Sequence, residues 1–224
     1  MRALSTAVLA AITLSVPAYA GTIIGAQSAV INEGGPGFGS LDYTFNQAGL
    51  SAGYIAGVTD FDSYIASGPS HTNIFNGFEW FSNSGTNAAS VTYDLGSLYQ
   101  ITSLALWNEE SSGIGSLSLF GSVDGSTFSS IGNFSPADNP DGSSYLAEVF
   151  DIASTQARFV RFDMSGCPQQ PSTFNACAIG EVAFDATAVN AVPEPATWAM
   201  MLIGFGMIGG ATRYGRKRVT IAYA

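Results

Sequence analysis

Basic residues are nearly absent from the middle of this chain. Of the seven lysines and arginines among its 224 residues, five lie near the two ends: Arg2, Arg213, Arg216, Lys217 and Arg218. Between residues 21 and 192 only Arg158 and Arg161 remain, whereas sixteen of the seventeen acidic residues lie there, which gives this part a net charge near −14. A surface of this charge does not bind a polyanion through a basic patch. We therefore exclude nucleic acid as a partner.

Histidine is also scarce, and this argues against catalysis. The one histidine, His71, follows the segment Gly49–Gly53, which fits the Gly-x-Ser-x-Gly pattern of serine hydrolases. Both features fall within roughly twenty residues, which leaves no room for the strands and helices that separate such groups in a hydrolase. Glu109 and Glu110 form the conspicuous acidic pair, and we interpret them as part of a solvated loop because adjacent strand residues point to opposite faces. We predict no catalytic residues and no enzyme activity.

Cysteine occurs only twice, at Cys167 and Cys177. The pair lacks the Cys-x-x-Cys spacing of redox and metal sites, and no histidine lies near it. An oxidising compartment favours a bond between the two thiols. We predict a structural disulfide that closes a short loop and stabilises the fold by about 2–3 kcal/mol.

The N-terminus carries the three parts of a secretory signal peptide over residues 1–20. Arg2 provides the positive start, residues 3–16 form the apolar core, and Ala18-Tyr19-Ala20 is a small-residue cleavage site. The apolar core is too short to span a bilayer. We predict cleavage after Ala20, which makes Gly21 the first residue of the exported protein.

Residues 191–224 combine a proline-rich segment, an apolar run and a basic cluster, in that order. The proline-rich segment is Pro193-Glu194-Pro195, and Trp198 follows closely. The apolar run over residues 197–212 is about 24 Å long as a helix, slightly short for a hydrocarbon core of about 30 Å. We predict a single transmembrane helix over 197–212, with the basic tail 213–218 in the cytoplasm and the bulk of the chain outside.

These C-terminal elements resemble the PEP-CTERM sorting signal in its PEPxxWA form. The matching positions are Pro193, Glu194, Pro195, Trp198, Arg213, Arg216, Lys217 and Arg218. The resemblance implies recognition by exosortase, a membrane protease-transpeptidase that removes the tail, in a Gram-negative bacterium that makes extracellular polysaccharide. It also implies export across the inner membrane, transient anchoring in the membrane, and then a location at the cell surface or outside the cell.

The middle of the chain has little helical periodicity and holds most of the 26 glycines. Alternating runs typical of strands are separated by turn residues and cover 91–95, 101–107, 117–123, 128–131, 145–152, 158–164 and 179–184. Asp124-Gly125 predicts a hairpin turn. Short strands at this spacing predict an all-β sandwich or barrel over residues 21–190. In the run 158–164 we favour ion pairs over ligand contact for both arginines.

Four motifs occur in a fixed order along these runs: Asp94-Leu95-Gly96, Ser122-x-Asp124-Gly125, the run 157–161 and Glu181-Val182. In this order they resemble the landmarks of discoidin-type domains, the galactose-binding-like jelly rolls also found as coagulation-factor C-type modules. The resemblance covers about residues 55–185 and implies a discoidin-like jelly-roll β-sandwich. Residues 21–54 do not match, and the usual disulfide between the ends of the domain is missing.

The resemblance also implies candidate sites. Such domains often hold one Ca²⁺ between an early loop and an acidic residue of the last strand, and the residues that could fill these roles are Asp60, Asp62 and Glu181. The alternative for the two aspartates is a turn held by their own side chains. Ligands usually contact loops at one end of the sandwich, where exposed aromatic rings stack on sugars, and Trp80 and Phe81 are candidates. Trp107 is better explained as part of the core.

Three functions remain open from the sequence. The first is a non-catalytic carbohydrate-binding protein of the cell surface or extracellular matrix, linked to exopolysaccharide and biofilm. The second is a structural matrix protein that makes protein contacts and binds no sugar. The third is a secreted glycoside hydrolase, which requires a pair of carboxylates that converge on a groove.

Overall fold

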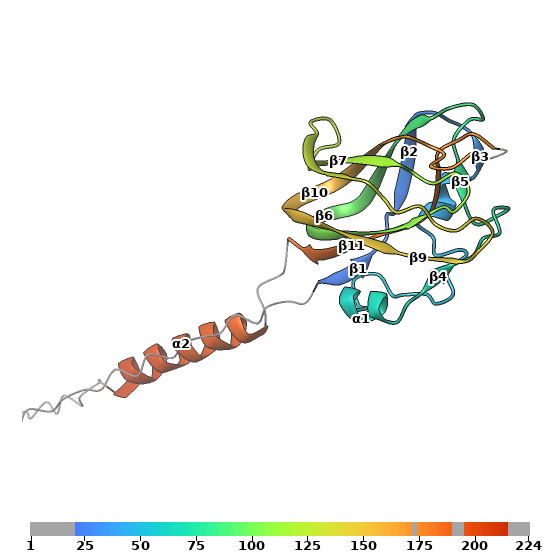
Figure 1. Cartoon of the computed structure of the whole chain (residues 1–224). Coiled ribbons are helices and arrows are strands. Elements are labelled where there is room, and N and C mark those ends of the chain that lie inside the picture. Colours follow the sequence, from blue (N-terminus) through green and yellow to red (C-terminus); the bar gives the residue numbers. More distant parts are fainter. Residues whose placement is uncertain (1–20, 172–173, 190–194, 215–224) are drawn as a thin grey trace, which may run out of the picture. The chain divides into compact units, whose positions relative to one another are not determined.

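The computed structural model describes residues 21–171, 174–189 and 195–214 (Figure 1). The predicted signal peptide with Ala20 therefore lies outside the described residues, as do parts of the sorting signal: Pro193, Glu194, Arg216, Lys217 and Arg218. The chain divides into two compact units, Met1–Thr187 and Ala188–Ala224.

Unit 1 is an antiparallel β-sandwich, which confirms the predicted fold class (Figure 1). The main sheet has nine strands in the order β3-β5-β11-β6-β10-β7-β8, with β1 paired to β11 and β2 paired to β6, and β4 pairs with β9 in a separate sheet. The strands are β1 (Thr22–Ile24), β2 (Ser28–Glu33), β3 (Phe38–Gly39), β4 (Ser70–His71), β5 (Trp80–Phe81), β6 (Ala88–Asn108), β7 (Ser116–Ser122), β8 (Ser129–Phe134), β9 (Tyr145–Leu146), β10 (Glu148–Ser165) and β11 (Ala178–Ala188). Two short helices, η1 (Leu41–Thr44) and α1 (Phe61–Ala66), lie between the early strands. The first two strands show that residues 21–54, which the motifs left unmatched, belong to the sandwich.

Strands β6 and β10 are much longer than the runs that the sequence predicted. Two predicted strands, 91–95 and 101–107, are both parts of β6, and β10 likewise contains 158–164 and most of 145–152. The pairing of β6 with β10 shifts register between Ala157 and Phe159, opposite the stretch of β6 that contains Gly96. Gly96 has a positive φ of 80°, which suits a bulge where a strand bends instead of ending.

The core lies between the layers and contains large aromatic residues. Trp107 is fully buried, as the sequence predicted. In β10 the alternation holds, because Val160, Phe162 and Met164 are buried. On the other face, Arg161 Nε lies 3.1 Å from a carboxylate oxygen of its neighbour Asp163.

The second arginine also forms an ion pair. Arg158 donates two hydrogen bonds of 2.8 Å to the Asp94 carboxylate.

Two further predictions about local structure are confirmed. Strands β7 and β8 form the predicted hairpin, with Gly125 of its turn at a positive φ of 74°. The predicted disulfide between Cys167 and Cys177 is formed, and it links the end of β10 to the segment that enters β11.

Unit 2 contains the helix α2 (Pro195–Tyr214). This helix includes residues 197–212, so the helical part of the C-terminal prediction is confirmed. Among the residues that the structure describes, no helix is both long enough and apolar enough to cross a membrane.

Candidate functional site

A cleft of about 560 Å³ in unit 1 has an aromatic wall. Four phenylalanines line it: Phe38, Phe75, Phe81 and Phe174. The ring of Phe81 is 4% exposed and contacts the other three, with centroid distances of 5.5–6.4 Å. Phe75 and Phe38 remain 55% and 43% exposed, and their ring centroids lie 5.8 Å apart. The buried ring therefore supports two exposed rings that can meet a ligand.

The rest of the cleft is acidic and amide-rich. Its polar side chains are Asn73, Glu109, Glu110, Ser111, Asp141 and Gln170, and no lysine or arginine lines the described part of the cleft. The Asn73 side chain is fixed, because its amide donates a 2.8 Å hydrogen bond to the carbonyl of Gly142. Carboxylates and amides beside aromatic rings provide hydrogen-bonding partners for a neutral ligand with many hydroxyl groups.

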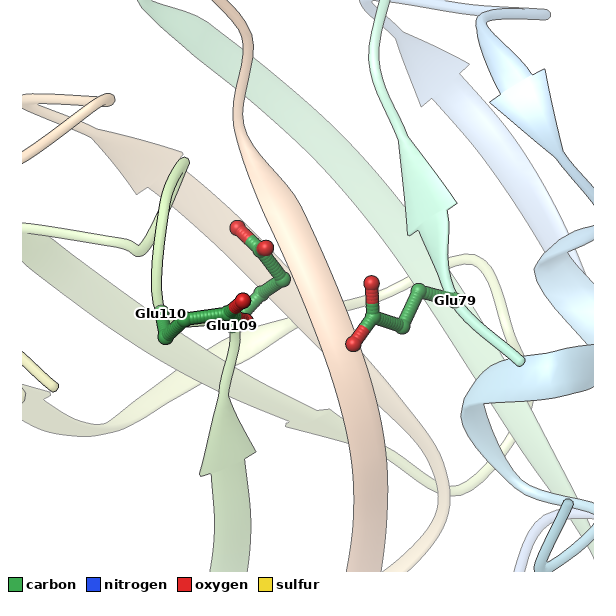
Figure 2. A group of neighbouring side chains, drawn as sticks. All are labelled: Glu79, Glu109 and Glu110. Atoms are coloured by element: carbon green, nitrogen blue, oxygen red, sulfur yellow. The ribbon is translucent and has the colours of Figure 1, made fainter. Parts of the chain in front are cut away.

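Two of the glutamates that line this cleft lie close to a third, Glu79 (Figure 2). Glu79 immediately precedes β5, and Glu109 and Glu110 immediately follow β6. They are 0%, 2% and 7% exposed, and each has a carboxylate oxygen within 4.8 Å of the other two. The interpretation of Glu109 and Glu110 as a solvated loop is wrong, because the chain turns inward after β6 and both side chains enter the protein.

Local hydrogen bonds orient the turn after β6. Glu109 Oε2 accepts hydrogen bonds from the backbone N–H groups of Ser111, at 3.0 Å, and Ser112. The Ser111 hydroxyl donates to the other oxygen of Glu109 at 2.9 Å. These donors hold the carboxylate of Glu109 in the turn, where it also interacts with the side chain of Glu110.

Burial and mutual repulsion disfavour the ionised forms of these acids. Burial, followed by the charge of Glu79, raises the pKa of Glu109. Burial and the nearby charge of Glu109 raise the pKa of Glu110 to about 8. Tyr145 donates a 2.7 Å hydrogen bond to Glu79 Oε1, and burial raises the pKa of this phenol well above its usual range. The group thus concentrates acidic side chains in a place where their charged forms are poorly solvated.

His71 lies against this group. Its Nδ1 is 3.5 Å from Glu79 Oε1, its ring contacts that of Tyr145 at 5.2 Å, and the side chain is 0% exposed. The two ring nitrogens lie 2.8 Å and 3.2 Å from the carbonyl oxygens of Thr72 and Ala48. Both ring nitrogens therefore face oxygen acceptors.

The structure places the two aromatic residues that the sequence suggested as ligand contacts, Trp80 and Phe81, in different surroundings. Trp80 is fully buried, and its indole N–H donates a 3.0 Å hydrogen bond to the carbonyl of Pro36. The prediction that it contacts a ligand is therefore wrong: its side of β5 faces the core. Its neighbour Phe81 points the other way and forms the base of the aromatic wall. Phe38 and Phe75, the exposed rings, were missed because no motif marks the segments that carry them.

The predicted calcium ligands do not come together. Asp60 caps the N-terminus of α1, where it accepts a 2.8 Å hydrogen bond from the Ser63 N–H, and Asp62 is exposed in the first turn of that helix. Glu181 lies on β11 at 0% exposure and accepts a 3.0 Å hydrogen bond from the Gln47 N–H. Among the described residues, these three acids do not form a group with mutually close ligand atoms. They do not fit Ca²⁺, which takes six to eight oxygen ligands.

Glu181 instead lies among tyrosines. Burial raises its pKa well above the usual range for a glutamate, and the Gln47 N–H opposes this only in part. Burial and the charge of Glu181 raise the pKa of Tyr64 to about 12. The environment thus favours the neutral carboxyl group at this position.

We expect Glu181 to make the domain less stable as the pH rises. Above about pH 4.5, the ordinary value for this group, the unfolded chain releases the proton while the folded chain retains it. The free energy of unfolding should therefore fall from pH 5 toward the raised pKa, by at most about 1.4 kcal/mol per pH unit. Glu181→Gln should remove this contribution to the slope of the unfolding free energy against pH. Urea denaturation at several pH values measures that slope.

The exposed Glu33→Gln provides the control for this experiment, since it should leave the slope of the wild-type protein unchanged. Equal slopes for the wild-type protein and Glu181→Gln would contradict a raised pKa at Glu181.

Comparison with protein families decides what kind of domain this is. Residues 58–181 match the model of the F5/8 type C domain, which is more than half of the chain. The chain belongs to the F5/8 type C domain family. Both the fold and the order of motifs in this F5/8 type C domain agree with the discoidin-like resemblance. Residues 191–218 match the PEP-CTERM protein-sorting motif, which indicates export and sorting to the cell surface and implies processing by exosortase.

Several solved structures are similar in fold to this F5/8 type C protein. The C-terminal domain of a chitobiase from Bacteroides fragilis is 15% identical with a TM-score of 0.45, over 75% of this chain and 99% of that one. A CBM32 of AlyQ in complex with 4,5-unsaturated mannuronic acid is 15% identical with a TM-score of 0.43, over 72% and 96% of the two chains. A CBM32 module from Clostridium perfringens in complex with GalNAc-β-1,3-galactose is 19% identical with a TM-score of 0.38, over 47% and 73%. No curated protein matches the chain significantly.

Proposed function

We propose that this protein is an exported, non-catalytic carbohydrate-binding protein of the cell surface or extracellular matrix. The observation that carries the proposal is the pair of exposed rings, Phe38 and Phe75, beside acidic and amide side chains in one cleft. Two of the structures similar in fold are CBM32 modules in complex with saccharides. The family match and the sorting motif support the same function and location.

The chemistry of the cleft favours a neutral saccharide. Aromatic rings offer a flat apolar surface to the C–H face of a sugar ring, and the exposed ring of Phe75 is available for this contact. The carboxylate of Asp141 and the amide of Gln170 provide acceptors and a donor for hydroxyl groups. An anionic sugar would meet uncompensated negative charge in the same cleft.

The location in this proposal follows the sorting motif. The signal peptide would direct export across the inner membrane of a Gram-negative bacterium, and exosortase would then recognise the Pro193-Glu194-Pro195 segment. The processed protein would reach the cell surface or the surrounding matrix. Extracellular polysaccharide, including that of a biofilm, is the partner that this location offers.

Binding of the full-length protein to a panel of neutral and anionic polysaccharides tests this function. We expect saturable binding to a neutral class. Phe75→Ala should weaken it about tenfold, because the ring loses its stacking contact with the sugar, and the melting temperature should change little. Isothermal titration calorimetry measures the affinity.

Ile55→Ala is the matched control, since Ile55 is 67% exposed and does not line the cleft. Equal affinities for Phe75→Ala and the wild-type protein would place the binding surface elsewhere. A folded protein that binds no member of the panel would contradict the proposal and favour a structural matrix component. Release of reducing sugar would favour a glycoside hydrolase.

A further inference from the structure

The group of Glu79, Glu109 and Glu110 holds more negative charge than its described surroundings neutralise. The one basic side chain close to it among the described residues is His71, 3.5 Å from Glu79. The two described arginines of the sandwich, Arg158 and Arg161, are paired with Asp94 and Asp163. Three carboxyl groups face this one imidazole, so their fully ionised forms would leave at least two units of negative charge inside the protein. Buried charge of this size requires protons or a counter-ion.

Two carboxylate oxygens of this group also have no hydrogen-bond partner in the described part of the chain. They are Glu79 Oε2 and Glu110 Oε2, and both are inaccessible to solvent. Glu79 is fully buried, and Figure 2 shows its carboxyl group turned toward Glu109 and Glu110. Buried carboxylate oxygens are normally hydrogen-bonded or bound to a cation, so two unpartnered oxygens in one close group of acids indicate a missing ligand.

We propose that Glu79, Glu109 and Glu110 bind one divalent cation of the oxygen-preferring class, and that this ion is Ca²⁺. A charge of +2 would offset the negative charge of the ionised carboxylates and favour that form. The ligand atoms lie within 4.8 Å of one another. Ca²⁺ takes several protein carboxylates in a flexible geometry, whereas Mg²⁺ keeps several waters and seldom binds a site built from protein carboxylates alone. The set contains no thiolate, which disfavours softer metals.

The cleft provides the route to this site, because Glu109 and Glu110 line it while Glu79 lies deeper. The hydrogen bonds from Ser111 and Ser112 to Glu109 and from Tyr145 to Glu79 hold two of the three ligands in place without the ion. The site differs from the one predicted at Asp60, Asp62 and Glu181. It also does not depend on sugar binding, since Ca²⁺ alone is the ligand.

Titration of the full-length, chelator-treated protein with Ca²⁺ alone tests the proposal. Calorimetry at pH 8 should show one site per chain. Glu79→Gln and Glu110→Gln should each weaken binding at least tenfold, because each removes a charged ligand without changing the size of the side chain. Glu181→Gln is the matched control: it makes the same substitution at another fully buried glutamate and should bind Ca²⁺ as the wild-type protein does.

Melting temperatures supply a second readout. In chelator at pH 8, Glu110→Gln should melt above the wild-type protein, because it removes one repelling charge. Excess Ca²⁺ should raise the melting temperature of the wild-type protein, so that the wild-type protein then melts above Glu110→Gln. If Glu79→Gln fails to fold, Glu110→Gln decides the result.

Two results would overturn the proposal. One is a wild-type protein that binds no Ca²⁺ at millimolar concentration, which would mean that protons neutralise the three acids. The other is binding that Glu181→Gln abolishes and that Glu79→Gln and Glu110→Gln retain, which would place the ion at Glu181.

Discussion

Trp80→Ala is expected to lower the free energy of unfolding by about 3–5 kcal/mol. The indole is fully buried between the layers, so its removal leaves a cavity that the surrounding strands cannot fill. The substitution also leaves the Pro36 carbonyl without its 3.0 Å hydrogen bond. A loss of this size is a large fraction of the stability of an ordinary domain. Urea denaturation followed by circular dichroism measures it.

Phe75→Ala provides the contrast within the same experiment. Its ring is 55% exposed, so we expect it to change the unfolding free energy by far less than Trp80→Ala while it weakens sugar binding. The opposite pattern, a stable Trp80→Ala protein that loses only ligand binding, would restore Trp80 as a ligand contact and contradict its role in the core.

Replacing both cysteines with serine is expected to lower the free energy of unfolding by about 2–3 kcal/mol. The bond between Cys167 and Cys177 closes a short loop and restricts the unfolded chain. Both sulfur atoms are also buried, so two hydroxyl groups would enter apolar surroundings and add to the loss. Thermal denaturation of the double variant and of the wild-type protein measures the difference.

The disulfide should also affect the cleft. The loop that it closes contributes Gln170, Pro171 and Phe174 to the lining. We therefore expect reductant to weaken sugar binding by the wild-type protein. The double variant is the control, because reductant has no bond to break in it. A wild-type protein whose stability and binding are unchanged by complete reduction would contradict both expectations.

Local patterns in the sequence determined the class of the fold. Alternation in runs such as 158–164 predicted strands with one buried face, and Val160 and Phe162 are buried as expected. The Asp124-Gly125 turn predicted the hairpin because glycine tolerates the positive φ that such turns need. The motif order predicted the family, and the segment around Pro193-Glu194-Pro195 predicted the sorting motif. These features depend on residues close together in the chain.

The lengths of the long strands were not predicted, because a bulge looks like a strand end in the sequence. The predicted strands 91–95 and 101–107 leave Gly96 between them, yet β6 continues through it. The pairing with β10 carries the strand past this point, and that pairing joins residues far apart in the chain.

The candidate site could be located almost only from the tertiary structure. The sequence placed Glu109 and Glu110 in solvent and Trp80 at a ligand, and the burial of all three shows the reverse. Burial is set by what packs on a residue from distant segments, and Glu79 meets Glu109 only because β5 and the end of β6 lie near each other in the folded sandwich. The sequence by itself determined an exported F5/8 type C sandwich with its disulfide. Only the tertiary structure decided where aromatic rings are exposed and where charge is buried, because both depend on contacts between segments far apart in the chain.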